Sequence, residues 1–111
     1  MIDMDNKQEI DRIKKVYQQR ADTINPRLYS YFDSASLFIN QRREWEILKI
    51  LKENGIYFLN DKIILDIGCG TGGELRNCVK YGAIPENCFG IDLLPDRIKR
   101  ASKISPNMDF R

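Results

Sequence analysis

The sequence of 111 residues contains no histidine. This absence excludes Ser-His-Asp and Cys-His triads, histidine-containing zinc sites and a histidine general base, and with them much of hydrolase chemistry. Cysteine is scarce, and Cys69, Cys78 and Cys88 have spacings that fit neither a disulfide framework nor a metal knuckle. We therefore expect three reduced thiols and no metal site.

Long apolar runs and a strong charge of one sign are also missing. No stretch of about 18 apolar residues is present, and the first ten residues lack the basic start and apolar stretch of a signal peptide. Eighteen Lys and Arg against sixteen Asp and Glu give a net charge of +2, which creates no large field for nucleic acid or an anionic membrane. We therefore expect a cytoplasmic protein with no strong nucleic-acid or membrane signal.

The first part of the chain predicts two amphipathic helices. In the first helix, which is predicted to end before Pro26, apolar residues over 10–24 recur at three- and four-residue steps, and Asn6 with Glu9 has the spacing of a capping box. The second helix is predicted from Leu37 to Glu53, where an apolar stripe faces one side and Gly55 supplies a left-handed stop.

The remaining sequence alternates between strand and helix patterns. The nearly continuous apolar run Ile63–Ile67 predicts a strand buried on both faces. A glycine-rich turn then leads into a helix over 74–82, followed by a strand at Cys88–Ile91, a helix over 95–103 and the beginning of a third strand at 108–111. This order predicts an α/β fold with a Rossmann-like parallel sheet, preceded by N-terminal helices.

The turn GCGTGG joins the first predicted strand to its helix. Glycine there adopts positive φ at little cost, and the missing side chain lets a ligand lie against backbone N–H groups at a helix N-terminus. Gly68, Gly70 and Gly73 satisfy the dinucleotide pattern GxGxxG, and Asp92 follows where the ribose-binding acid of that fold is expected. The pattern thus predicts a nucleotide-like ligand but leaves the cofactor open.

Asp66 distinguishes between the candidate cofactors. Its carboxylate, two residues before the first glycine, would repel a pyrophosphate and attract a cation. Here the sequence IILDIGCGTG, together with FGIDLLPDRIKRA, resembles the class I S-adenosylmethionine-dependent methyltransferases over about residues 37–111. The resemblance implies a methyltransferase with S-adenosyl-L-methionine as its cofactor.

The same resemblance implies a role for each residue of the cofactor site. Asp66 would hold the amino acid end near its ammonium, and residues 68–70 would line the methionine moiety. Asp92 would accept hydrogen bonds from both ribose hydroxyls, and Leu93 would lie against adenine. Cys69 is interpreted as a small spacer, because no histidine is present to activate it as a nucleophile. The implied cofactor-binding residues are Asp66, Gly68, Cys69, Gly70, Gly72, Asp92 and Leu93.

The resemblance also implies a division of the chain and a missing part. Residues 1–58 would form a helical extension or cap, and residues 59–111 the N-terminal half of the cofactor-binding domain, truncated before the strands that carry acceptor-binding and catalytic residues. The acceptor, a small molecule or a glycan or lipid precursor, and the catalytic residues therefore stay unassigned. The first strand would keep an unpaired edge and an exposed apolar face, which is a hazard for self-association.

Two other functions stay open beside the methyltransferase. One is an NAD-dependent oxidoreductase fragment, and the other is a non-catalytic binding module with a truncated fold. A basic cluster on the helix over 95–103 is interpreted as a solvated helix face rather than a site for an anionic partner. Its members are Arg97, Lys99, Arg100 and Lys103. Four residues before the first predicted strand could form a lid over the cofactor, but ordinary packing is the preferred interpretation. They are Tyr17, Arg20, Tyr29 and Tyr31.

Overall fold

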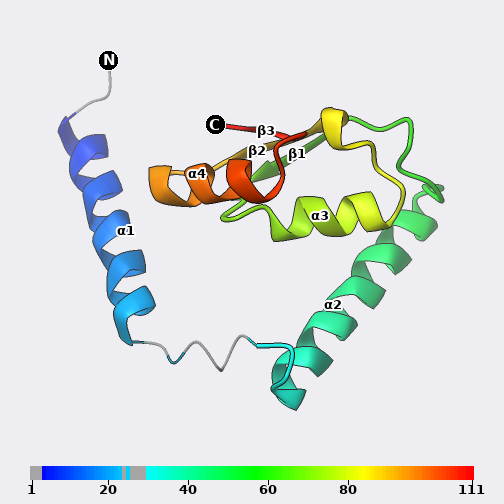
Figure 1. The fold of residues 1–111 in the computed structure, drawn as a ribbon, viewed down its shortest axis with the longest axis horizontal. Coiled ribbons are helices and arrows are strands. Elements are labelled where there is room, and N and C mark those ends of the chain that lie inside the picture. The colour runs from blue at the N-terminus through cyan, green and yellow to red at the C-terminus, as the bar shows by residue number, and fades with distance from the viewer. Residues whose placement is uncertain (1–3, 24, 26–29) are drawn as a thin grey trace. The chain divides into compact units, whose positions relative to one another are not determined.

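The computed structural model describes residues 4–23, 25 and 30–111. The chain divides into two compact units, Met1–Tyr57 and Phe58–Arg111, and each is described by itself. The first unit contains two helices and the second a small α/β arrangement (Figure 1). The elements in chain order are α1 (Met4–Thr23), α2 (Ser34–Glu53), β1 (Ile64–Ile67), α3 (Gly73–Lys80), the short 3-10 helix η2 (Pro85–Asn87), β2 (Cys88–Ile91), α4 (Pro95–Ile104) and β3 (Asp109–Phe110).

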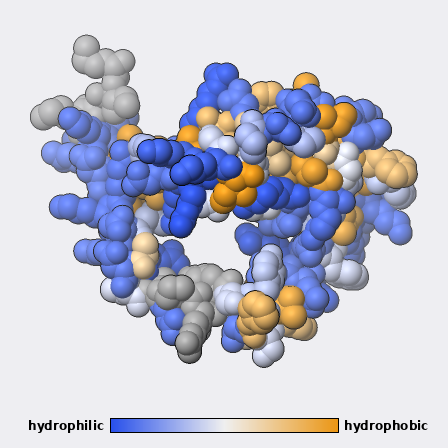
Figure 2. Space-filling view, viewed as in Figure 1, coloured by the Kyte–Doolittle hydropathy of each residue, from blue (hydrophilic) through white to orange (hydrophobic). Residues whose placement is uncertain are grey.

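Helix α1 begins earlier than the sequence pattern predicts. Because the helix already includes Met4, Asn6 lies within its first turns and the predicted capping box is wrong. Glu9 instead accepts a hydrogen bond from Nε of Arg12 at 2.9 Å, one turn further along the helix. Ile10 and Ile13 are half-buried, and mainly hydrophilic side chains cover the face of α1 drawn in Figure 2.

Helix α2 has a defined cap at each end. Oδ2 of Asp33 accepts a hydrogen bond from N of Ser36 at 2.9 Å, so the helix starts at Ser34, three residues before the predicted Leu37. The predicted end at Glu53 is confirmed, and Gly55 follows with a φ of 76°, the left-handed conformation that stops the helix. None of the helices described over 4–23, 34–53 and 73–104 has enough length and apolar character to cross a membrane.

The second unit is a three-stranded parallel sheet with the order β1-β2-β3. Asp66 of β1 pairs with Gly90 of β2, which in turn pairs with Phe110 of β3. Helix α3 connects β1 to β2, and helix α4 connects β2 to β3. The predicted succession of strands and helices is therefore confirmed as a mixed α/β unit with a small parallel sheet.

The sheet is covered on one face only among the described residues. Cys88, Gly90 and Phe110 point to the covered face and are buried. On the opposite face the exposed fractions are 79% for Ile63, 56% for Leu65 and 75% for Ile67, so the prediction that this strand is buried on both faces is wrong. The physical reason is that successive crossovers of one hand place α3 and α4 on the same side. An apolar run alone does not distinguish one covered face from two.

Strand β1 lies at an edge of the sheet, because β2 is its only partner among the described residues. The predicted unpaired edge and exposed apolar face are therefore both present. The core of this unit is small, and Leu75, Cys88 and Ala101 are its most completely buried apolar residues.

Candidate functional site

The candidate site lies where β1 and β2 end. The turn of residues 68–72 follows β1, and Asp92 follows β2 directly. Since the two strands are parallel neighbours, both segments lie at the same edge of the sheet, where ligands bind in open α/β sheets. The structure thus places the glycine turn beside Asp92, although Asp92 follows Gly73 by 19 residues in the sequence.

Three glycines of the turn have positive φ, but their surroundings differ. A Cβ at Gly68 (φ 76°) would meet nothing within 4 Å, and at Gly70 (φ 56°) it would meet only Nη1 of Arg97, at 3.7 Å. At Gly72 (φ 87°) it would come within 2.8 Å of Cζ of Phe110. Gly68 and Gly70 therefore leave open backbone surface, whereas Gly72 is required for packing and for the start of α3.

The N–H groups of the turn are mostly used within the protein. Those of Gly68 and Cys69 donate to the carbonyl oxygen of Ile91 at 2.8 and 3.0 Å. The N–H of Gly70 donates to Asp92, and that of Gly72 donates back to Cys69. The expectation of a row of bare donors is therefore wrong for these four residues. In the part of the chain that the structure describes, the N–H groups of Thr71 and Gly73 donate to no acceptor.

Asp92 is half-buried and connects two backbone segments. Its Oδ2 accepts the N–H of Gly70 at 2.8 Å, and its Oδ1 accepts the N–H of Leu94 at 2.8 Å. A carboxylate offers about four acceptor positions, so about two stay available for donors from a ligand. Leu93, between these segments, exposes 50% of its surface beside the site.

Cys69 lies inside the turn as a buried, neutral thiol. Burial raises the pKa of Cys69 above its ordinary value, and the negative charges of Asp92 and Asp66 raise it further. A thiol with a raised pKa is a poor nucleophile at neutral pH, which agrees with its interpretation as a spacer. Asp66 is half-buried, at the position of β1 that pairs with Gly90. The two carboxylates therefore create a negative potential at the turn.

Arg97 adds a positive charge to this site that the sequence analysis did not assign to it. Its Nη1 is 3.7 Å from the position that a Cβ of Gly70 would occupy. The sequence shows Arg97 only as part of a basic cluster, because nothing in the helical periodicity indicates which cation turns toward the glycines.

Two further residues hold the turn in place and were also missed. Nη1 of Arg76 donates to the carbonyl oxygen of Thr71 at 2.7 Å and to Oγ of Ser105 at 3.3 Å. Gly90 in β2 allows close packing, because a Cβ there would lie 2.8 Å from Sγ of Cys69. A glycine inside a strand is the one available sequence signal for such an approach.

The residues considered for a lid do not belong to the unit that contains the turn. Tyr17, Arg20 and Tyr31 belong to the first unit and are exposed, and Tyr29 lies outside the described residues. Among the described residues, no group of three or more Cys, Asp or Glu side chains is arranged to hold a metal ion. The candidate site therefore consists of the turn, the two acids, Arg97 and Leu93.

Compared with known proteins, the chain matches no family model, no curated protein and no solved structure. The function must therefore be argued from the site itself. Open glycines between two carboxylates and one guanidinium suit a ligand that carries a cation, an anion and hydroxyl groups.

Proposed function

We propose that the second unit binds S-adenosyl-L-methionine at the glycine turn, and that the chain is a methyltransferase or the cofactor-binding half of one. The observation that carries this proposal is the pair of left-handed glycines, Gly68 and Gly70, whose Cβ positions are open between Asp66 and Asp92. The parallel order β1-β2-β3 supports a Rossmann-like fold as part of the same proposal. Free cysteines support a cytoplasmic location.

The charges of the site suit the groups of this cofactor. Asp66 provides a negative charge for the ammonium, and Arg97 a positive charge for the carboxylate. The remaining acceptor positions of Asp92 suit two ribose hydroxyls, and Leu93 offers apolar surface to adenine. When bound, the cofactor supplies an electrophilic methyl group. The acceptor, a small molecule or a glycan or lipid precursor in this proposal, must be identified separately.

Calorimetric titration of the 111-residue chain with S-adenosylhomocysteine, and with NAD in a parallel cell, tests the proposal directly. We expect binding of the first ligand and none of the second. Gly70→Val places a branched side chain in the open surface and should abolish binding. Gly55→Val is the matched control, because Gly55 also has positive φ and open surroundings but belongs to the other unit. Retained affinity in a folded Gly70→Val variant would place the ligand elsewhere.

A dinucleotide is the second candidate ligand, and one observation favours it. The guanidinium of Arg97 beside Gly70 would also suit a pyrophosphate, which would make the chain part of an NAD-dependent oxidoreductase. Asp66→Asn separates the two proposals, since removing this charge should weaken a ligand with an ammonium and strengthen one with a pyrophosphate. If neither ligand binds the folded chain, both enzyme proposals fail and a non-catalytic binding module is left.

A further inference from the structure

We propose that the basic face of α4 binds a small polyphosphate anion. The basic face is defined by Arg97, Lys99, Arg100 and Lys103. With Asp96 these residues line a hollow of about 280 Å³. The proposal does not rest on the proposed function, because Lys99, Arg100 and Lys103 lie outside the candidate cofactor site; Arg97 belongs to both sites.

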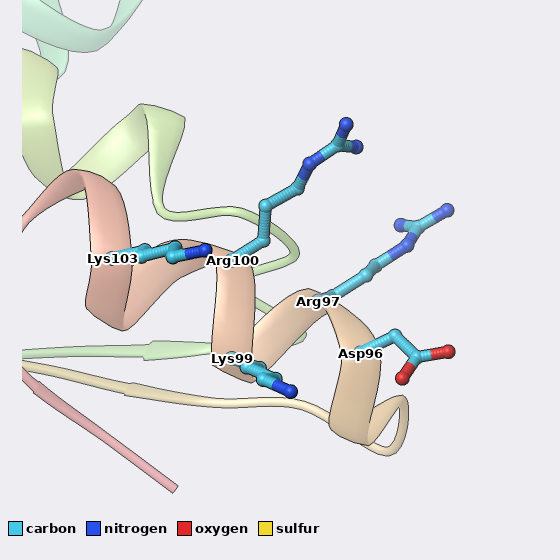
Figure 3. A pocket seen from close by; sticks show the side chains of 5 residues that line it. All are labelled: Asp96, Arg97, Lys99, Arg100 and Lys103. Carbon is cyan, nitrogen blue, oxygen red and sulfur yellow. The ribbon is translucent and has the colours of Figure 1, made fainter.

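Helical geometry places three of these side chains together. At 3.6 residues per turn, Lys99, Arg100 and Lys103 fall on one side of the helix, and Arg97 lies at its margin. Figure 3 shows that all the lining residues come from α4 and that Arg97 and Arg100 extend from it in similar directions. Ala101 is buried, and the helix contacts β3, so a different side of α4 is used for packing.

Three of the four cations of this face lack an anionic partner in the described part of the chain. The side chains of Lys99, Arg100 and Lys103 form no ion pair or hydrogen bond among the residues described, and Asp96 is the one acid that lines the hollow. Three other exposed arginines are paired with nearby carboxylates, whereas Arg20 and Arg43 have no ion pair among the described residues. These pairs are Arg12 with Glu9, Arg42 with Glu46, and Arg111 with Asp109.

The positive charges of the basic face repel one another when no anion is bound. Lys99 and Lys103 are four residues apart, and Arg100 and Lys103 are three apart, so each pair meets on the helix surface with like charges. Asp96 lies in the first turn, where the helix N-terminus already attracts a carboxylate. A bound anion would offset this repulsion.

The size of the face favours a small polyanion over a nucleic acid. From Asp96 to Lys103 the helix rises by only about 10 Å. A protein that contacts about six to ten phosphates of a nucleic acid needs a longer track of cations. The hollow of about 280 Å³ is below the usual range of about 300–1,000 Å³ for drug-sized ligands. Two or three linked phosphate groups match both the length and the charge.

Titration of the 111-residue chain with inorganic tripolyphosphate at low salt tests the proposal. The Lys99→Gln/Lys103→Gln double variant should weaken binding by about tenfold or more, because it removes two charge-assisted contacts. Lys15→Gln/Lys52→Gln is the matched control: it removes the same charge at exposed positions outside α4. Its affinity should stay within about twofold of the original, because neither Lys15 nor Lys52 belongs to the basic face.

Several outcomes would overturn the proposal. They are absence of tripolyphosphate binding by the original chain, an equal loss in both double variants, or tighter binding of a single-stranded oligonucleotide that depends on the same lysines. Circular dichroism verifies that the variants are folded. The titration with S-adenosylhomocysteine gives a separate readout, because neither Lys99 nor Lys103 belongs to the candidate cofactor site.

Discussion

Oδ2 of Asp92 accepts the backbone N–H of Gly70 at 2.8 Å and thereby joins the glycine turn to the end of β2. The second oxygen of the same carboxylate orients the chain at Leu94, where α4 is about to begin. The acid predicted to contact ribose therefore also shapes the loop that would surround the ligand. A mutation of Asp92 should therefore affect both the conformation of the loop and the binding of a ligand.

Asp92→Ala and Asp92→Asn should separate the two roles. The alanine variant leaves two backbone donors without their acceptor, and we expect the free energy of unfolding to fall by about 1–3 kcal/mol together with weaker ligand binding. The asparagine variant keeps one acceptor oxygen, so it should be more stable than the alanine variant while losing the negative charge. Urea unfolding and titration with S-adenosylhomocysteine measure the two effects. An unchanged dissociation constant in Asp92→Ala would contradict the cofactor assignment.

Gly90→Ala should destabilise the second unit. The new Cβ would lie 2.8 Å from both Sγ of Cys69 and Cδ1 of Phe110, so the core must shift at a cost of about 1–3 kcal/mol. Gly73→Ala is the control, because its nearest neighbour is Nη2 of Arg76 at 3.9 Å and its φ is not in the left-handed region. We expect that variant to be neutral or slightly stabilising in urea unfolding. Equal stability of the two variants would contradict the packing described for Gly90.

Cys69 should make stability depend on pH in the alkaline range. Because its pKa in the folded protein is raised above the ordinary value of 9.0, the folded state retains the proton to higher pH than the unfolded state. The stability that this thiol contributes is present below pH 9.0 and is lost as the pH rises through the folded pKa. Urea unfolding below and above pH 9.0 should show a steeper decline for the original chain than for Cys69→Ala. Parallel declines would show that the thiol is not protected.

Asp33→Ala should destabilise helix α2. The substitution removes the acceptor of the Ser36 N–H and should cost about 0.5–2 kcal/mol, whereas Asp33→Asn retains a capping oxygen and should cost less. Asp22→Ala is a suitable control, because Asp22 accepts only an exposed side-chain hydrogen bond from Gln18 near the end of α1. Helicity by circular dichroism and thermal unfolding measure the difference. A larger loss in Asp22→Ala would contradict the capping role.

The exposed apolar face of β1 should cause self-association. Ile63, Leu65 and Ile67 present a continuous apolar strip beside an unpaired strand edge in the described structure. We expect sedimentation that depends on concentration, and a shift toward the monomer in Leu65→Lys. Val16→Lys is the control, because it removes an exposed apolar side chain from α1. An ideal monomer at all concentrations would contradict this prediction.

The order and the approximate bounds of the elements could be predicted from the sequence, because hydrophobic periodicity and glycine stops are local signals. Gly55 ends α2 in the left-handed conformation, as predicted, and Gly82 follows α3 with a φ of 106°. The capping box failed for a local reason as well: Asn6 and Glu9 have the required spacing, but the helix begins before them. Asp33 was missed because aromatic and turn-forming residues around it obscure the start of α2.

The parts of the site that depend on distant contacts could not be predicted. The sequence indicates that glycines and two acids surround a turn. It does not show that the carboxylate of Asp92 occupies the N–H of Gly70, nor that Arg97 turns toward the same glycine. Both facts follow from the register of β2 on β1 and from the direction of α4, which involve residues more than 20 positions apart. For the same reason, the sequence does not show that the helices cover only one face of the sheet.

Phe110 packs beside the glycine turn, so the turn is not complete until this late residue has been synthesised. The ring of this residue lies against Gly72 and Gly90, although it follows Gly72 only after two α-helices, a short 3-10 helix and a strand. During synthesis the turn is therefore made long before the side chain that fills the space beside it. The glycine turn lacks the side chain that packs against it until β3 has left the ribosome. We therefore expect a turn that can bind ligand to form in the same folding step as the complete three-stranded sheet.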